Sequence, residues 1–368
     1  MILKVTGDRN KTAKMFPALV ANPIPLWTYN VNAYDGHPYS GTIIGLSPYN
    51  HGKTTTTIPT QIVPLVITIT DSNGTIVYDP TAPDACVPSH SGIDIIANSP
   101  IFISNPWTMN GVNVGTAQYE DANVRAEFWQ LVGDTPYHVA LQESTLAGQA
   151  LSFGTGAGAS GPGTNYPIGN FSACDPTGVV NVNDMSNAVE ALITSGPLAG
   201  TINVGTNPMF LTKNIVMAEV GTSIFSACCI LGFHGAFNVG PNLQLYSPFV
   251  VDTAGVFGSG FSSVIAHEVG EAIHDPNGSN PTPVWGNEGQ TVGTCQNNFE
   301  DGDPLSPGFG TPTNEWVVPG SNGLTYDLQE LVFFNWFYGD PNLAESGHYS
   351  NNGTFTGFAK ACPPGGTN

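Results

Sequence analysis

Positively charged residues are scarce in this chain of 368 residues. Lys and Arg together number 8 against 28 Asp and Glu, so the formal net charge is -20 with neutral histidines. Nucleic acids and anionic membranes bind basic surfaces, which makes both of them poor partners for this chain. With so few cations, positive self-repulsion stays limited when carboxylates become protonated, and this composition favours a secreted protein that works in acid.

Long hydrophobic runs are absent as well. No window approaches about 20 uninterrupted apolar residues, the length that crosses a membrane as a helix. The apolar run within residues 1–20 is too short for a signal peptide or a membrane span, so we expect a soluble chain without membrane insertion. Hydrophobic residues still make up 40% of the sequence, which is enough for a full core in two packed lobes or one large domain.

The cysteines lack the C-x-x-C spacing of a zinc ribbon. The six are Cys86, Cys174, Cys228, Cys229, Cys295 and Cys362. Up to three disulfides in an extracellular, oxidising compartment is one interpretation, and buried free thiols are the other. The neighbours Cys228 and Cys229 would bridge each other only with strain.

Abundant Gly and Pro, 44 and 30 residues, confine long helices to a few windows. The pattern predicts an α+β protein with a β-rich N-terminal lobe over residues 1–152, a Gly-rich linker over 153–168 and a second lobe over 169–368. The expected strands cover residues 28–34, 61–69, 75–79, 92–97, 137–144, 213–220, 227–233 and 243–252. The expected helices cover residues 119–132, 184–195, 262–274 and 326–337.

A second histidine is missing where a zinc-protease helix would carry it. In IAHEVGEAIHDP, residues 265–276, His267 and Glu268 are followed by Glu271. Ser262 or Ser263 can cap the start of this helix, and Pro276 predicts its end near position 274. At about 100° per residue, one face of the helix is apolar and the other carries the His and Glu side chains.

Spacing assigns different roles to the polar residues of this helix. His267 and Glu271 lie one turn apart, so an imidazole nitrogen and a carboxylate oxygen can converge on one cation. Glu268 is placed to take a proton from a metal-bound water, as the second residue of HExxH does in zinc proteases. His274 lies about 10 Å farther along the axis, where an interaction with the helix C-terminus is favoured over ligation.

A third ligand is needed for a catalytic zinc site. Glu300 is the first choice and Asp303 the second, because both follow in the acidic stretch FEDGDP. An acidic turn or a calcium loop is the alternative for that stretch. Glu330 is a third candidate, with a capping or core-edge carboxylate as its alternative. One His with two carboxylates makes a harder, more anionic site than two His with one Glu. Zinc (Zn2+) is still the expected ion, and calcium (Ca2+), manganese and iron are less excluded.

Several stretches resemble a group of uncharacterised secreted proteins from soil bacteria. They are AHEVGEAIHDP, NPTPVWG, CQNNFEDGDPL and LTYDLQELVFFNWF, and the likeness extends over most of the chain. The order HExxE, Asp-Pro, Trp and E-x-G-D is also similar to a motif of other secreted proteins that are suspected metallopeptidases. The matching positions are His267, Glu268, Glu271, Asp275, Trp285, Glu300 and Asp303. The resemblance implies a metal-binding, zincin-like lobe whose active-site helix packs on a sheet.

These observations predict a secreted metal-dependent hydrolase, foremost a zinc endopeptidase acting on polypeptides. Hydrolysis of a non-peptide bond is a second possibility. The competing class is a non-enzymatic extracellular surface, adhesion or assembly protein with a structural calcium site. Three residues, His234, Tyr246 and His348, are polar candidates for stabilising an oxyanion, although a structural role is favoured for each.

Overall fold

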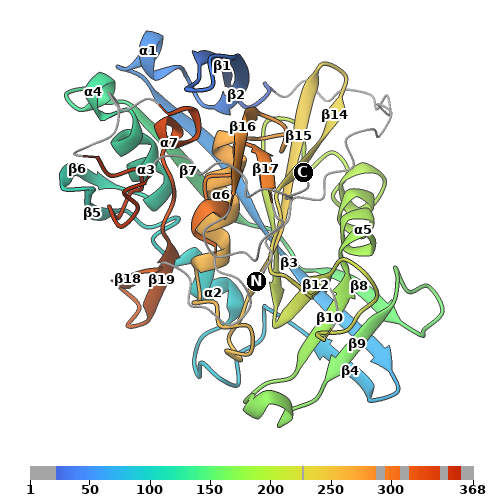
Figure 1. The fold of residues 1–368 in the computed structure, drawn as a ribbon. Helices are drawn as coiled ribbons and strands as arrows, with labels where there is room; N and C mark the ends of the chain where they lie inside the picture. Colours follow the sequence, from blue (N-terminus) through green and yellow to red (C-terminus); the bar gives the residue numbers. More distant parts are fainter. Residues whose placement is uncertain (1–21, 226–227, 287–294, 307–314, 340–346, 358–368) are drawn as a thin grey trace.

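The computed structural model describes residues 22–225, 228–286, 295–306, 315–339 and 347–357. The protein is a β-rich α+β fold with 41% strand and 19% helix. One large, curled, mixed sheet forms a half-barrel, and several small sheets surround it (Figure 1). The predicted α+β class is therefore confirmed at this level.

The largest sheet is built on one long strand. Its seven strands are β3 (Thr55–Asp71), β4 (Gly74–Tyr78), β7 (His138–Thr145), β8 (Gln149–Gly154), β11 (Asn207–Lys213), β14 (Gly235–Val239) and β15 (Asn242–Val251). β3 pairs in parallel with β7, β8 and β11, and antiparallel with β4. β15 continues the sheet parallel to β11, and β14 pairs antiparallel with β15. The sheet thus combines strands from both sides of the predicted linker.

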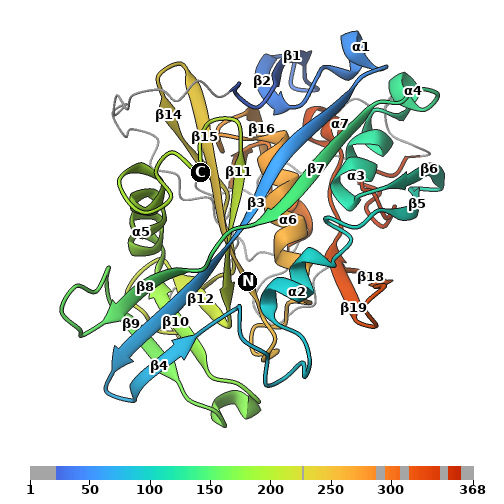
Figure 2. The same ribbon diagram turned by 180° about the vertical axis from the view of Figure 1, so that it is seen from behind.

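Side chains alternate between two cores on either face of this sheet. On β11, Met209 and Leu211 belong to one core and Phe210 to the other. Helix α6 (Ser263–His274) contributes Ile265 to the first core, whereas helix α5 (Val182–Thr194) packs in the second. Figure 2 shows the two helices on opposite sides of β3 and β11. Because both faces are covered, every residue of β11 is buried, as expected for a central parallel strand.

Smaller sheets and short helices complete the fold. The second sheet has four strands, β9 (Gly163–Tyr166), β10 (Thr177–Asn181), β12 (Ile215–Ala218) and β13 (Cys228–Ile230). The two-stranded sheets pair β1 (Leu26–Asn32) with β2 (Pro38–Ile44), β5 (Asn105–Met109) with β6 (Val112–Ala117), β16 (Pro281–Gly286) with β17 (Cys295–Asn298), and β18 (Glu315–Pro319) with β19 (Thr325–Gln329). The remaining helices are α1 (Pro48–His51), α2 (Gly92–Ala97), α3 (Tyr119–Glu127), α4 (Trp129–Val132) and α7 (Phe334–Tyr338), with single 3-10 turns η1 (Asn170–Ser172) and η2 (Asp303–Leu305).

Helix α6 lies at the centre of the molecule, between the large sheet and the elements α3, α7 and β19 (Figure 1). It contacts β15, β19, β2 and α3, and all twelve of its residues are buried. Its predicted end at His274 is confirmed. Ser262 precedes its first residue, but the Ser262 hydroxyl donates to the Asp327 carbonyl and does not cap the helix. Burial of both faces means that the polar side chains of α6 need partners inside the protein.

Two element predictions are wrong, and a third is correct only in part. Residues 92–97 form helix α2, not a strand. The Ser91 side chain caps this helix by accepting a hydrogen bond from the amide of Asp94. The consecutive residues Ile95 and Ile96 are both buried, whereas a half-buried strand would expose one of them. Residues 326–337 are not one helix: strand β19 ends at Gln329 and α7 begins at Phe334. The predicted helix over 119–132 is interrupted at Phe128, between α3 and α4.

The Gly-rich segment 153–168 contains the end of β8 and the strand β9. Asn165 of β9 is fully buried, and its amide group donates to the carbonyl oxygens of Ile69 and Gly74. This part of the chain is therefore hydrogen-bonded to the large sheet.

Disulfides join two pairs of cysteines in the described residues. Cys86 bonds to Cys174, 88 positions later, and Cys228 bonds to its neighbour Cys229 across a cis peptide bond. Cys295 is also disulfide-bonded, and Cys362 lies outside the described residues.

Among the described residues, no helix is long and apolar enough to span a membrane.

Candidate metal centre

Three segments bring acidic and imidazole side chains together at the middle of α6. The helix itself supplies His267, Glu268 and Glu271. Residues 231–233 are held against β15 by hydrogen bonds from the Phe233 amide to Pro248 and from the Val250 amide to Leu231, and this pairing carries the next residue, His234, toward the helix. The turn that follows β17 supplies the acidic residues Glu300, Asp301 and Asp303.

One group of potential ligands consists of His267, Glu271 and Asp303. One ligand atom from each residue lies within 4.8 Å of the others, and all three side chains are buried. His267 Nε2 is 2.9 Å from Glu271 Oε1 and 3.7 Å from Asp303 Oδ1. Ligand atoms around a tetrahedral cation at about 2 Å lie about 3 to 4 Å apart, so this group needs little adjustment to hold an ion.

Gln329 fixes the orientation of the His267 ring. The Gln329 amide nitrogen donates to the Gly302 carbonyl, which leaves its oxygen to accept a hydrogen bond from His267 Nδ1 at 3.1 Å. Nδ1 therefore carries a hydrogen, and Nε2 is the nitrogen available to a cation. A hydrogen-bond acceptor behind the ring is the usual support of a metal-binding histidine.

The second group of potential ligands consists of His234, Glu268 and Glu271, again buried and mutually within 4.8 Å. His234 Nε2 lies 2.9 Å from the Asp275 carbonyl oxygen, which can only accept, so Nε2 carries the hydrogen. Nδ1 points toward Glu271, 3.5 Å from Oε2, and has no hydrogen-bond partner. Both histidines thus have one nitrogen fixed by a neutral acceptor and the other facing the acidic cluster.

Glu268 is the least satisfied side chain of the cluster. It is 1% exposed, and neither of its carboxylate oxygens has a hydrogen-bond partner. A β-carbon on Gly232 would lie 2.6 Å from Glu268 Oε1, so only glycine lets the backbone approach this carboxylate. A buried ionised carboxylate without a partner is costly, and a cation relieves that cost.

Mutual charge shifts the pKa values of the cluster in opposite directions. Burial alone would lower the pKa of His267, but Glu271 and the nearby acids outweigh it and raise that pKa to about 10. Burial raises the pKa of Glu268, and burial together with the charge of Glu271 raises the pKa of Asp303. For Glu271, His267 and His234 outweigh the effect of burial and lower the pKa. The metal-free cluster therefore holds protons that a bound cation would displace.

Glu300 lies beside the cluster. Its Oε2 is 3.8 Å from His234 Nε2, and its Oε1 accepts a hydrogen bond from Asn298. Burial and the charge of Glu271 raise its pKa well above the ordinary value. Glu300 is in neither ligand group, whereas Asp303, the second choice from sequence, is in the first.

Glu330 is occupied by other contacts. Its oxygens accept hydrogen bonds from Ser350 and from the amide and hydroxyl of Thr354, and it belongs to neither ligand group. Tyr246 contacts Ser186 and Glu190 on the α5 side of the sheet. His348 contacts the Gly353 carbonyl. Three residues were candidates for stabilising an oxyanion, and of these His234 lies in the cluster.

His274, at the end of α6, has a different environment. Its Nε2 is 2.8 Å from Glu127 Oε2, and its Nδ1 is 2.8 Å from Asp301 Oδ2 and 3.0 Å from the Gly270 carbonyl. Burial alone would lower its pKa, but Glu127 and Asp301 hold it well above the ordinary value. Asp275, the next residue, accepts hydrogen bonds from the amides of Ser279 and Asn280.

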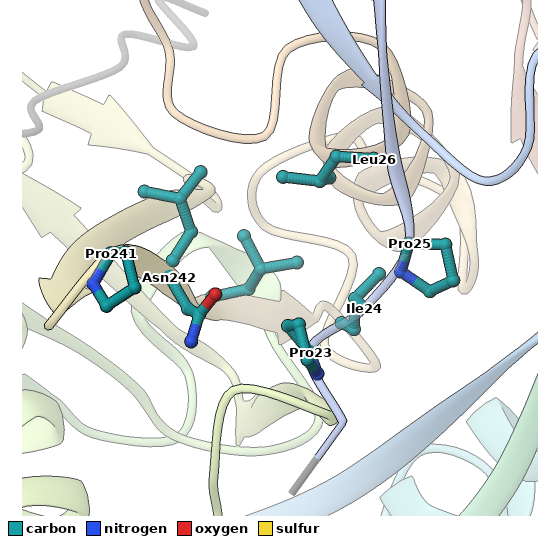
Figure 3. Close-up of a pocket in the computed structure, with 8 residues that line it drawn as sticks. Pro23, Ile24, Pro25, Leu26, Pro241 and Asn242 are labelled. Atoms are coloured by element: carbon teal, nitrogen blue, oxygen red, sulfur yellow. The ribbon is translucent and has the colours of Figure 1, made fainter. Parts of the chain in front are cut away.

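A pocket of about 280 Å³ lies elsewhere, between residues 23–26 and the β14–β15 turn (Figure 3). Its lining is Pro, Leu, Ile and one Asn, and it includes none of the residues of the two ligand groups. It therefore offers no acid, base or metal ligand.

Comparisons of the chain with protein-family models, curated proteins and solved structures found no match. The function is therefore inferred from the geometry of the cluster.

Proposed function

We propose that this protein is a secreted metal-dependent hydrolase, an endopeptidase, with a zinc ion bound by His267, Glu271 and Asp303. The observation that supports it is the arrangement of His267, whose Nδ1 is fixed by Gln329 while Nε2 faces two buried carboxylates. Imidazole ligands favour zinc and other transition metals over calcium, which prefers oxygen ligands alone.

Glu268 would act as the general base. Zinc held by three protein ligands keeps a position for water, polarises a carbonyl and lowers the pKa of that water. Glu268 follows His267 on α6, and its two oxygens have no hydrogen-bond partner. It can therefore accept a proton from the water and pass it to the leaving amine.

The extracellular location is supported by the disulfides. The Cys86–Cys174 bond joins distant parts of the chain, as is typical of proteins from oxidising compartments. The zincin-like character of the α6 region is supported by the packing of this helix on β15 of the large sheet.

Burial favours a second candidate function, a structural metal in a non-enzymatic extracellular protein. His267, Glu271 and Asp303 are each about 1% exposed. A structural ion would be enclosed by protein ligands, whereas a catalytic ion leaves a position open.

Metal content and hydrolysis together test the proposal. We expect elemental analysis of protein purified without chelator to find zinc in the parent and in Glu143→Gln, a control outside the cluster, but not in Glu271→Ala. Cleavage of an unstructured protein substrate should be lost in Glu271→Ala and fall by at least about 100-fold in Glu268→Gln. Zinc without cleavage in the parent would support the structural alternative, and the absence of any metal would contradict both.

A further inference from the structure

We propose that the centre binds a second divalent cation, through His234 Nδ1, Glu268 and Glu271 Oε2, so that Glu271 bridges two ions. This inference rests on the proposed function, because the first ion is the one assigned to His267, Glu271 and Asp303. The two groups share Glu271 and no other residue.

The two oxygens of Glu271 face different histidines. Oε1 is 2.9 Å from His267 Nε2, and Oε2 is 3.5 Å from His234 Nδ1. Among the described residues, neither ligand group contains both His234 and His267. The nitrogens of these two rings are therefore too far apart to belong to one compact group of three ligands. A carboxylate with one oxygen toward each of two separate donor sets has the geometry of a bridging ligand.

The donors of the second group are available for a ligand. His234 Nδ1 has no hydrogen-bond partner, and the contact of Nε2 with the Asp275 carbonyl keeps the hydrogen on the other side of the ring. Both oxygens of Glu268 are likewise without a partner. His234 and Glu268 are each 1% exposed, so water does not satisfy these atoms from the surface.

The charge of the cluster also favours two ions. Glu268, Glu271, Glu300 and Asp303 are all buried carboxylates, and metal-bound histidines are neutral. When all four carboxylates are ionised, one divalent cation leaves two negative charges uncompensated in the interior, where unpaired charge is costly. A second divalent cation would compensate them.

A bridged pair of cations has a definite chemical use. Two ions about 3.5 to 4 Å apart can bind both the attacking and the leaving oxygen or nitrogen in a hydrolytic displacement. Glu268 has two oxygens, so binding the second ion through one of them leaves the other for proton transfer. Glu268 can therefore bind the second ion and still act as the general base.

Metal stoichiometry tests the second ion. After saturation with Zn2+ and removal of excess, we expect about two equivalents in the parent and in His90→Ala, a control histidine paired with Asp94 outside the cluster. His234→Ala should retain about one, and His267→Ala should also lose one. One equivalent in the parent that His234→Ala leaves unchanged would overturn the second ion and preserve the proposed function. No zinc in the parent would overturn both.

Spectroscopy on the unaltered protein gives an answer that does not depend on the folding of a variant. Loaded with Mn2+, two ions bridged by Glu271 should give an exchange-coupled paramagnetic resonance spectrum. A spectrum of isolated Mn2+ at full saturation would contradict the bridged pair. Adding Mn2+ in steps should produce the signal of isolated ions before the coupled signal.

Discussion

Helix α6 carries two buried histidines, His267 and His274, about two turns apart, with different surroundings. His274 contacts a carboxylate at each ring nitrogen, Glu127 on one side and Asp301 on the other. His267 has a neutral amide oxygen behind Nδ1 and carboxylates only in front of Nε2. Both are 1% exposed, so burial does not distinguish them.

The groups around the two rings distinguish a structural histidine from a metal ligand. A ring with a carboxylate at each nitrogen is held as an imidazolium, which has no lone pair to offer a cation. A ring fixed at one nitrogen by a neutral acceptor keeps the other for a ligand. By this criterion His234 resembles His267, because its Nε2 contacts a carbonyl and its Nδ1 is unsatisfied.

Removing the structural histidine should have the largest effect on stability. His274→Ala leaves Glu127 and Asp301 buried without their cation, so the free energy of unfolding of the metal-free protein should fall by about 3 to 5 kcal/mol. Denaturant unfolding measures this change. His90→Ala removes a half-exposed contact with Asp94 and should cost less than about 1 kcal/mol. Equal effects of the two variants would show that His274 is not the structural member of the pair.

Metal should stabilise the fold through the other histidine of α6, His267. Zinc at 100 times its dissociation constant should raise the free energy of unfolding by about 2.7 kcal/mol in the parent. A chelator should reverse the gain, and His267→Ala should reduce it. Unfolding curves with and without zinc measure the effect. A zinc response in Glu271→Ala equal to that of the parent would place the ion elsewhere.

The residue behind the metal-binding ring should have an intermediate effect. Gln329→Leu removes the acceptor of His267 Nδ1, so we expect zinc affinity to weaken by about 10 to 100-fold. Competition with a chromophoric chelator gives the affinity, and Gln149→Leu on strand β8 is the control. Unchanged affinity in Gln329→Leu would mean that the ring needs no support from this side.

Proton linkage should give the smallest effect for a change of one pH unit. Burial, with the charge of Asp301, raises the pKa of Glu120 well above its ordinary value of 4.5. The folded protein therefore keeps a proton that the unfolded chain releases, and stability falls as the pH rises above about 4.5 until the folded pKa is reached. The slope is at most about 1.4 kcal/mol per pH unit.

Glu120→Gln isolates that slope. The variant should lose this contribution when the free energy of unfolding of the metal-free protein is measured between pH 4 and pH 7. Glu143→Gln should keep it. A pH dependence unchanged in Glu120→Gln would show that Glu120 ionises in the folded protein as it does in the unfolded chain.

Local sequence was sufficient for the helix and part of the cluster. The periodicity of residues 262–274 predicted α6 and the adjacency of His267 and Glu271, because both depend on helical geometry alone. Asp303 was one of two choices in the acidic turn, and only the folded course of that turn distinguishes it from Glu300. That choice depends on long-range packing.

His234 shows what local sequence does not contain. It follows a segment pinned to β15, and its ring is held by a carbonyl at the end of α6, 41 positions later. No local residue spacing around His234 predicts its contact with the Asp275 carbonyl. The sequence contains one weak indication of this contact: His234 is a single histidine in an apolar stretch, and Gly232 lies two positions before it. In the structure, the backbone at Gly232 approaches the Glu268 carboxylate closely.

The pairing of strand β3 links the unfolding of the two halves of the chain. Its 17 residues pair with β4, β7 and β8 from the first half of the chain and with β11 from the second. Loss of this one strand would break the backbone pairing of both halves at once. Heating should therefore give a single cooperative transition, with calorimetric and spectroscopic midpoints in agreement, and a fragment ending near residue 152 should not fold alone.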